Sequence, residues 1–323
     1  MQKTALILIA AFAATACGGK KVSAETPAQE NVAPAAKPVE FNADSAYSYV
    51  ARQVDFGPRV PNTEAHRRCG DWLASELRRH GASVTEQTAS LKAFDGTVLN
   101  ARNIFAQYNP EAKERTLLLA HWDCRPWADQ DPDPAMRDKP VDGANDGASG
   151  TGVLLEIARQ LAGNNAGGKG IDILFVDAED WGTDGDEDSW ALGARHFVEN
   201  PPVSGYSPDE AILLDMVGGK NAVFCREYFS ERSAPALAQA IWSIADARGY
   251  GHIFLNRMGS AVTDDHVQLI KQGIPAIDII EYHPDSDSGF NPRWHTASDN
   301  MDGIDPATLK AVGETVMQYI ANN

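Results

Sequence analysis

Cysteine is scarce in this sequence, with four residues in a chain of 323. No two of them have the CxxC spacing that is typical of zinc and redox sites. Beyond Cys17, a disulfide among Cys69, Cys124 and Cys225 would leave one thiol over, and the spacing does not select the pair. A hydrophobic content of 43% is ample for the core of one large or two small domains.

Basic residues are outnumbered by acidic ones, 28 Lys and Arg against 45 Asp and Glu, so the formal net charge is −17. Nucleic acids and anionic membranes are bound through basic patches, and this composition argues against both as partners. An acidic cleft would instead attract metal cations.

Apolar runs long enough to span a bilayer are also lacking. The run "ALILIAAFAATA" follows Lys3, is too short for a spanning helix, and is typical of an export signal. It ends at Cys17, which resembles the modified cysteine of a bacterial lipoprotein, although Ala14 stands where Leu is usual; an ordinary secretory signal is the alternative. We expect residues 1–17 to be this signal segment and a lipid at Cys17 to anchor the exported protein to a bacterial membrane, facing the periplasm or the outside.

Residues 18–40 are rich in Ala, Pro, Glu and Lys and have no periodic apolar pattern, which indicates a flexible tether. Residues 41–323 contain no linker of this kind and no internal repeat, so we expect a single catalytic domain there. Apolar strands alternate with amphipathic helices, which predicts an α/β fold: a three-layer sandwich with a mixed, mainly parallel central sheet flanked by helices. Helices are expected over 43–54, 63–80, 148–162, 190–199, 233–248, 265–272 and 306–321. Strands are expected over 82–90, 98–107, 116–121, 171–177, 210–216 and 275–281.

Polar side chains follow three of the expected strands where each strand ends. His121 ends "TLLLAH", Glu179 and Asp180 follow "ILFVDA", and Asp215 follows "AILL". An acid at a strand end is usually a turn or cap residue. In open α/β sheets, however, ligands bind beyond the carboxyl ends of the strands, so three coinciding cases favour a shared site.

Two further segments contribute candidate metal ligands. The turn "VDGANDGASGTG" places Asp146 among glycines, and it lacks the features of a phosphate-binding loop. The segment "RWHT" contains His295, which would ordinarily be a solvated loop histidine. Beside several carboxylates it suits zinc, because catalytic zinc sites use three nitrogen or oxygen ligands and keep one open position.

Two acidic segments have less specific interpretations. "TDGDED", residues 183–188, begins like a calcium loop, but Ser189 and Arg195 stand where that loop needs Gly and Glu, so a solvated loop is expected. "TDDH" places Asp264 and Asp265 at a helix start, where capping accounts for one of them. The other is free to enter the cleft.

The ordered set "AHWD", "GANDGASG", "FVDAED", "LLDMVG", "TDDH" and "RWHT" resembles the zinc-dependent aminopeptidase family and its branch of glutaminyl-peptide cyclotransferases (glutaminyl cyclases), above all the bacterial, animal-like type. The resemblance covers residues 41–323. It implies one zinc ion, and the ligands it assigns to that ion are Asp146, Asp180 and His295. It also implies that Glu179 is the general acid/base and is hydrogen-bonded to Asp215 and Asp264, and that Phe290 and Trp294 line the substrate pocket.

The chain departs from the animal enzymes at two points. Asp180 replaces a glutamate ligand and is one methylene shorter, which shifts the geometry and keeps an ordinary zinc ligand. The animal enzymes also have a pocket tryptophan where this chain has the 183–188 segment, and Trp127, Trp181 and Trp190 are the candidates to replace it.

Two reactions fit the same scaffold. A cyclase would convert the N-terminal Gln of peptides or proteins to pyroglutamate. A two-zinc aminopeptidase would hold its second metal with His121, Asp146 and Asp215 and would hydrolyse N-terminal residues. A protein that only binds is a third class, and the filled catalytic positions argue against it. Trp294 directly before His295 and the additional acid of "TDDH" favour the cyclase.

Overall fold

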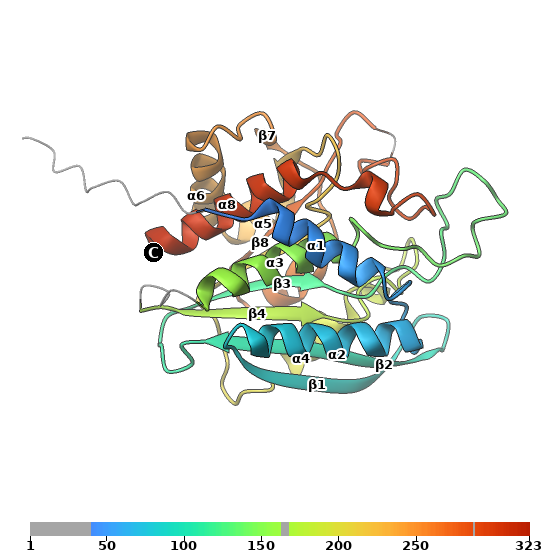
Figure 1. Ribbon diagram of the computed structural model, residues 1–323, viewed down its shortest axis with the longest axis horizontal. Coiled ribbons are helices and arrows are strands. Elements are labelled where there is room, and N and C mark those ends of the chain that lie inside the picture. The colour runs from blue at the N-terminus through green and yellow to red at the C-terminus, as the bar shows by residue number, and fades with distance from the viewer. Residues whose placement is uncertain (1–39, 163–167, 287) are drawn as a thin grey trace, which may run out of the picture. The chain divides into compact units, whose positions relative to one another are not determined.

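A six-stranded sheet runs through the part of the chain that the computed structural model describes, residues 40–162, 168–286 and 288–323 (Figure 1). The described residues lie in the compact unit Lys37–Asn323. The strand order is β1(Ser83–Lys92), β2(Val98–Tyr108), β4(Gly170–Val176), β3(Arg115–His121), β5(Glu210–Asp215) and β8(Ala276–Ile280). β1 pairs antiparallel with β2 and β2 with β4, whereas β4, β3, β5 and β8 run parallel. The expected mixed, mainly parallel sheet is therefore confirmed.

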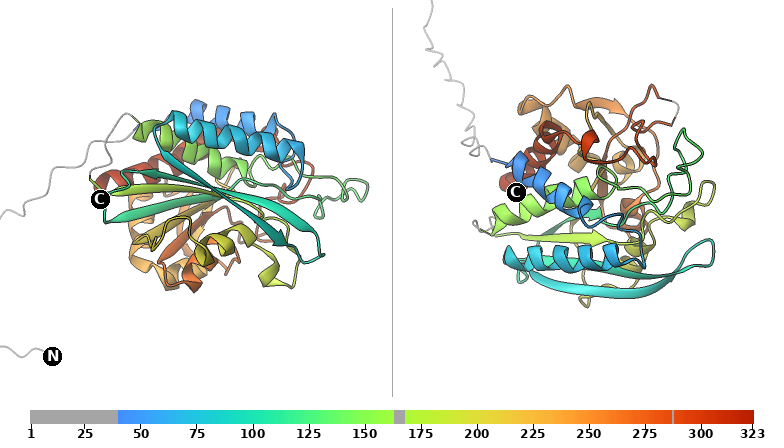
Figure 2. Two further views of the ribbon diagram at one scale, coloured as in Figure 1. Left: turned by 90° about the horizontal axis from the view of Figure 1, so that it is seen from below. Right: turned by 45° about the vertical axis from the view of Figure 1, so that its right-hand side comes forward.

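Helices cover both faces of this sheet, which confirms the three layers (Figure 2). One face carries α1(Ala43–Val54), α2(Glu64–Arg79), α3(Ala148–Leu161) and α8(Pro306–Asn322). The other face carries α4(Leu192–Glu199) and α7(Asp265–Lys271), which pack on each other and on the sheet. β3 and β4 are buried along their whole length, as strands covered on both faces should be.

The helix starts follow from local capping. Asn42 accepts a hydrogen bond from the backbone N–H of Ser45 at the start of α1, and Thr63 does the same for His66 in α2. Asp305 caps α8 and is followed by Pro306, whose fixed φ suits the first helical position. Caps of this kind explain why several expected boundaries agree with the structure within one or two residues.

Two expected helices differ from the structure. The helix expected over 233–248 corresponds to α6(Pro235–Ala247), which begins two residues later because Ala234 is extended (φ −138°) in front of Pro235. The helix expected from residue 190 begins at Leu192, since Ala191 adopts a left-handed conformation (φ 55°).

Five short elements of the described residues had no counterpart in the expected pattern. One is the helix α5(Tyr228–Ser233), which precedes α6. β6(Phe224–Arg226) and β7(Phe254–Met258) form a separate two-stranded sheet, and η1(Glu187–Ser189) and η2(Met301–Gly303) are single 3₁₀ turns. These five elements span only three to six residues each, too short to show a period.

The three cysteines of the described residues, Cys69, Cys124 and Cys225, are buried free thiols, so none of the possible disulfides is present. Cys17, the expected signal segment and most of the expected tether lie outside the described residues. Within residues 40–323 as described, no helix is both long enough and apolar enough to cross a membrane.

Helix α3, which follows the glycine-rich turn, packs so closely on the sheet that Gly150 has no room for a side chain. A Cβ at Gly150 would collide with the carbonyl oxygen of Leu214 in β5 and lie 2.9 Å from the Cβ of Ala120 in β3. We expect Gly150→Ala to lower the free energy of unfolding by about 1–3 kcal/mol, the usual cost of overpacking. Ser75→Ala on the exposed side of α2 is the control and should change it by less than about 0.5 kcal/mol. Urea unfolding followed by circular dichroism measures both, and equal midpoints would contradict the tight contact.

Candidate metal and catalytic site

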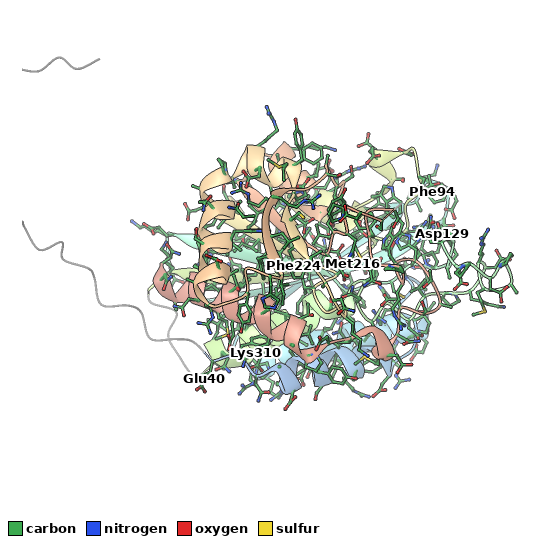
Figure 3. The ribbon with its side chains drawn as sticks, turned by 90° about the horizontal axis from the view of Figure 1, so that it is seen from above. Glu40, Phe94, Asp129, Met216, Phe224 and Lys310 are labelled. Carbon is green, nitrogen blue, oxygen red and sulfur yellow. The ribbon has the colours of Figure 1, made fainter. Side chains whose placement is uncertain are left out.

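The parallel strands β3, β4 and β5 end at the same edge of the sheet, and the expected site residues follow them there. The chain turns sharply after β4 at Ala178 (φ 54°) and after β5 at Met216 (φ 48°), which is labelled in Figure 3. Left-handed conformations are uncommon outside glycine, and they tend to persist where the surrounding structure enforces them for function. These turns direct Glu179, Asp180 and Asp215 toward one cavity.

Three groups of buried side chains among the described residues could hold a metal ion. One consists of Asp264, His266 and Asp278, and the other two share Asp146. In the first of these two, His295 Nε2 lies 3.2 Å from Asp180 Oδ1 and 3.6 Å from Asp146 Oδ2. In the second, His121 Nε2 lies 3.0 Å from Asp146 Oδ1 and 3.2 Å from Asp215 Oδ1. In each group one ligand atom per residue lies within 4.8 Å of the others. Both ligand sets named from the sequence are thus brought together.

The first group, Asp146, Asp180 and His295, suits a metal ion in its ligand types and in the buried carboxylate oxygens that lack hydrogen bonds. Both carboxylate oxygens of Asp180 are buried without a hydrogen-bond partner among the described residues. Its nearest basic groups are His295 Nε2 and Arg125 Nη1, 3.2 and 3.5 Å from Oδ1. A buried carboxylate without hydrogen bonds is costly, and a bound cation lowers that cost. One imidazole nitrogen and two carboxylates are a ligand set that zinc takes, with room for a fourth ligand.

Two acids that the sequence analysis did not assign hold the backbone of the ligand-bearing turns. Asp299 accepts hydrogen bonds from the backbone N–H groups of Asn145 and Asp146, at 2.9 and 3.1 Å. Asp123 accepts from those of Glu179 and Asp180, both at 3.2 Å. Asp123 belongs to "AHWD" and Asp299 follows "RWHT", so their proximity to the motifs was the available signal.

A third acid orients a ligand side chain. Asp129, labelled in Figure 3, lies with Oδ1 3.5 Å from His295 Nδ1, and its carboxylate also accepts hydrogen bonds from Arg125. Although burial opposes ionisation, His295 and Arg125 hold the pKa of Asp129 well below its usual range. An ionised acid behind a metal-ligating histidine fixes the ring orientation and raises ligand basicity.

Glu179 lies in the same cavity, is 9% exposed, and has a pKa raised well above its ordinary value. Burial is the main cause; the carboxylates of Asp264 and Asp180 add to it, whereas His121 opposes it. Burial and Asp264 also raise the pKa of Asp215, to about 7. Buried carboxyl groups that lie close together have raised pKa values, because each disfavours the charge of the others. A group that accepts and returns a proton near neutral pH requires such a raised pKa.

The hydrogen bonds of Asp215 and Asp264 differ from what the family resemblance implied. Among the described residues no hydrogen bond joins either side chain to Glu179. Asp215 instead lies against His121, and Asp264 accepts from the backbone N–H of Asp265 at the start of α7. Both acids still line the cavity with Glu179, and Asp264 acts on it electrostatically by raising its pKa. Asp265 is buried and does not line the cavity.

Aromatic rings enclose the His295 side of the cavity. The indole of Trp294 stacks on the His295 imidazole with ring centroids 3.9 Å apart, and Phe290 lies 4.7 Å from Trp294. Trp190 stacks on His295 from 6.1 Å and also lines the cavity. Of the three tryptophans that could replace the missing pocket residue, Trp190 is therefore the one that lines it.

The cavity has a volume of about 620 Å³. The acids and His295 lie on one part of its lining, which we call the floor. Residues from 184–190, 260–263, 282–286 and 288–290 form most of the rest. The "TDGDED" segment is exposed, as expected, but Asp184 and Glu187 face the cavity, which the sequence did not indicate.

The acid directly after β4 has a structural role. Asp177 is fully buried and contacts His66 Nε2 through both carboxylate oxygens, at 2.9 and 2.8 Å. His66 stacks on Trp122 with ring centroids 4.2 Å apart. This cluster holds α2 against the end of β4, away from the cavity.

Comparison with known proteins places this site in a family. The model of peptidase family M28 matches residues 103–320. Among curated proteins, the glutaminyl-peptide cyclotransferase of Gloydius blomhoffii is 23% identical over 248 residues, covering 68% of this chain and 64% of that protein. The aminopeptidase YwaD of Bacillus subtilis is 26% identical over 268 residues, covering 80% of this chain and 52% of that protein. The chain thus spans less than two thirds of these relatives.

Solved structures are more similar. The glutaminyl cyclase of Porphyromonas gingivalis has 56% identity and a TM-score of 0.86, with 87% of this chain and 98% of that chain covered. A Zn-dependent exopeptidase from Parabacteroides distasonis has 54% identity and a TM-score of 0.87, with 88% and 100% covered. With its matching family model, its α/β sandwich and its buried His/Asp metal cluster, the chain belongs to peptidase family M28.

Proposed function

We propose that this protein is a zinc-dependent glutaminyl-peptide cyclotransferase, which converts the N-terminal Gln of peptides to pyroglutamate and releases ammonia. The observation that carries the proposal is the aromatic enclosure of the metal group, in which Trp294 stacks directly on His295 and Phe290 and Trp190 extend the wall. Such a wall excludes water from the reacting amide and so disfavours hydrolysis. The similarity to solved glutaminyl cyclases adds support.

The reaction needs a group that moves one proton. Zinc held by Asp146, Asp180 and His295 would supply a Lewis acid for the carbonyl oxygen of the side-chain amide. Glu179 takes a proton from the substrate's α-amine as that nitrogen attacks the amide carbon. It then returns the proton to the amide nitrogen, which leaves as ammonia while the five-membered lactam closes. Burial and the carboxylate of Asp264 disfavour its charged form and so keep it able to donate, and Asp215 lines the same cavity.

A two-zinc aminopeptidase is the second candidate, and one observation favours it. The group of His121, Asp146 and Asp215 has the spacing for another metal ion next to the first. Two metals about 3.5–4 Å apart would activate water for attack on a peptide bond. The matching Bacillus aminopeptidase is consistent with that chemistry.

Product analysis separates the two candidates. We expect the purified protein to release ammonia from Gln-initiated peptides, with a loss of about 17 mass units that mass spectrometry detects, because cyclisation expels the amide nitrogen. Leu-initiated peptides of equal length should stay intact. Release of free Leu without any pyroglutamyl product would contradict the cyclase and favour the aminopeptidase.

Substitution separates the proton-transferring acid from the metal ligands. Glu179→Gln should lower kcat by at least about a hundredfold, since the amide cannot shuttle the proton, while zinc stays bound. Asp180→Ala and His295→Ala should lose zinc as well as activity. Elemental analysis after gel filtration measures the metal, and Asp184→Asn, an acid outside the metal group, is the control that should retain it. Near-normal turnover by Glu179→Gln would place the base elsewhere.

We also propose that the protein is exported and held at a membrane by a lipid on Cys17. The support is the short apolar run after Lys3 that ends in Ala-Thr-Ala before this cysteine. Lipidation should make Cys17 the first residue of the mature chain and give its N-terminal peptide the mass of a diacylglyceryl group. An unmodified N-terminus elsewhere in residues 14–25 would contradict the anchor and favour an ordinary secretory signal.

A further inference from the structure

The rim of the cavity carries two carboxylates without counter-charges. Asp184 and Glu187 are exposed and line the cavity, and among the described residues neither makes a hydrogen bond or ion pair. Asp188 beside them lies 3.5 Å from both Arg195 and Lys271. Of the acids in this loop, the two that face the cavity are thus the ones left available to a ligand.

The loop is built to hold this arrangement. Asp186 caps the 3₁₀ turn η1, and its backbone N–H donates to the carbonyl of Thr183 at 3.2 Å. Ser189 is buried, and its Oγ accepts from the backbone N–H of Thr183 at 2.9 Å. Gly185 provides the left-handed conformation (φ +83°) that the turn needs. The backbone bonds across 183–189 keep Asp184 and Glu187 on the cavity side.

No arginine or lysine lines the cavity among the described residues, and its one basic side chain is His295, a proposed metal ligand on the floor. A peptide that places its N-terminal residue on that floor must lead its next residues out past the rim. There an acidic side chain meets only like charges, whereas a cationic one finds two carboxylates. The chain's formal net charge of −17 also attracts a cationic peptide and repels an acidic one as each approaches the protein.

We propose that Asp184 and Glu187 form a recognition site for a cationic side chain, Arg or Lys, at the residue following the N-terminal Gln. The inference rests on the proposed cyclase function for its reaction and names the substrate class of that site. Exposed ion pairs contribute little each, so the preference is expected to be moderate: about tenfold in kcat/KM for Gln-Arg amide over Gln-Glu amide. It should shrink as salt rises to 0.5 M, because exposed charges are screened.

The test compares three proteins on the peptide amides Gln-Arg, Gln-Ala and Gln-Glu, with ammonia release as the readout. In the double variant Asp184→Asn/Glu187→Gln the ratio of Gln-Arg to Gln-Glu should fall below about threefold. The control Glu111→Gln/Asp188→Asn also removes two exposed acids, neither of which lines the cavity, and should keep the wild-type ratio. A wild-type ratio near one, or an unchanged ratio in the double variant, would overturn the proposal.

A binding measurement tests the rim site independently of the proposed cyclase reaction. Calorimetric titration of Gln-Arg and Gln-Glu amides into Glu179→Gln measures the same preference without turnover. If no Gln peptide yields ammonia but Gln-Arg amide binds about tenfold tighter, the proposed function fails and the rim site stands. If ammonia forms and the two affinities are equal, the rim site fails alone.

Discussion

The burial of several carboxylates in one cavity is the constraint on which the rest of the site depends. The acids at the floor are at most 9% exposed and lie at the carboxyl ends of parallel strands or on the turns beside them. They are Asp146, Glu179, Asp180, Asp215 and Asp264. Unpaired buried charges are too costly to keep, so the molecule must supply cations, protons or both. In the proposed cyclase, a metal ion at Asp146, Asp180 and His295 and shared protons around Glu179 meet that need in one cavity.

The surrounding structure is arranged to hold these acids in place. Ala178, Met216 and His295 adopt left-handed backbone conformations, which is unfavourable for residues other than glycine. Asp123 and Asp299 accept hydrogen bonds from the backbone of the turns that carry the acids, and so fix where those turns lie. The left-handed residues set the direction of the turns, and the buried carboxylates of Asp123 and Asp299 hold the backbone of those turns in place.

Much of this could be predicted from the sequence because the signals are local. Apolar runs ending in acids specify buried strands and a site at their carboxyl ends, and caps such as Asn42 and Thr63 specify helix starts. The short strands β6 and β7 could not be found, since three to five residues carry no period and their pairing depends on distant contacts. Likewise, the motifs identified the acids but not the missing hydrogen bonds between Glu179 and its neighbours.

The rim residues Asp184 and Glu187 are a second case in which the sequence did not predict what the structure shows. The charges of residues 183–188 are evident in the sequence, and exposure is what they predict. Which of them face the cavity depends on a turn closed by Ser189 and Gly185, and on tertiary packing of that turn near Trp190. Position within the fold, more than composition, thus distinguishes a solvated acid from one that can contact a substrate.

The proposed cyclase requires one metal ion, with Glu179 beside it free to act on the substrate's amine. Crystals of the zinc-loaded protein, with anomalous diffraction measured at the zinc edge, test this most directly. For a cyclase we expect one strong peak, bounded by Asp146, Asp180 and His295, with one zinc per chain by elemental analysis. A second peak of equal height between His121, Asp146 and Asp215 would contradict it and identify a two-metal hydrolase.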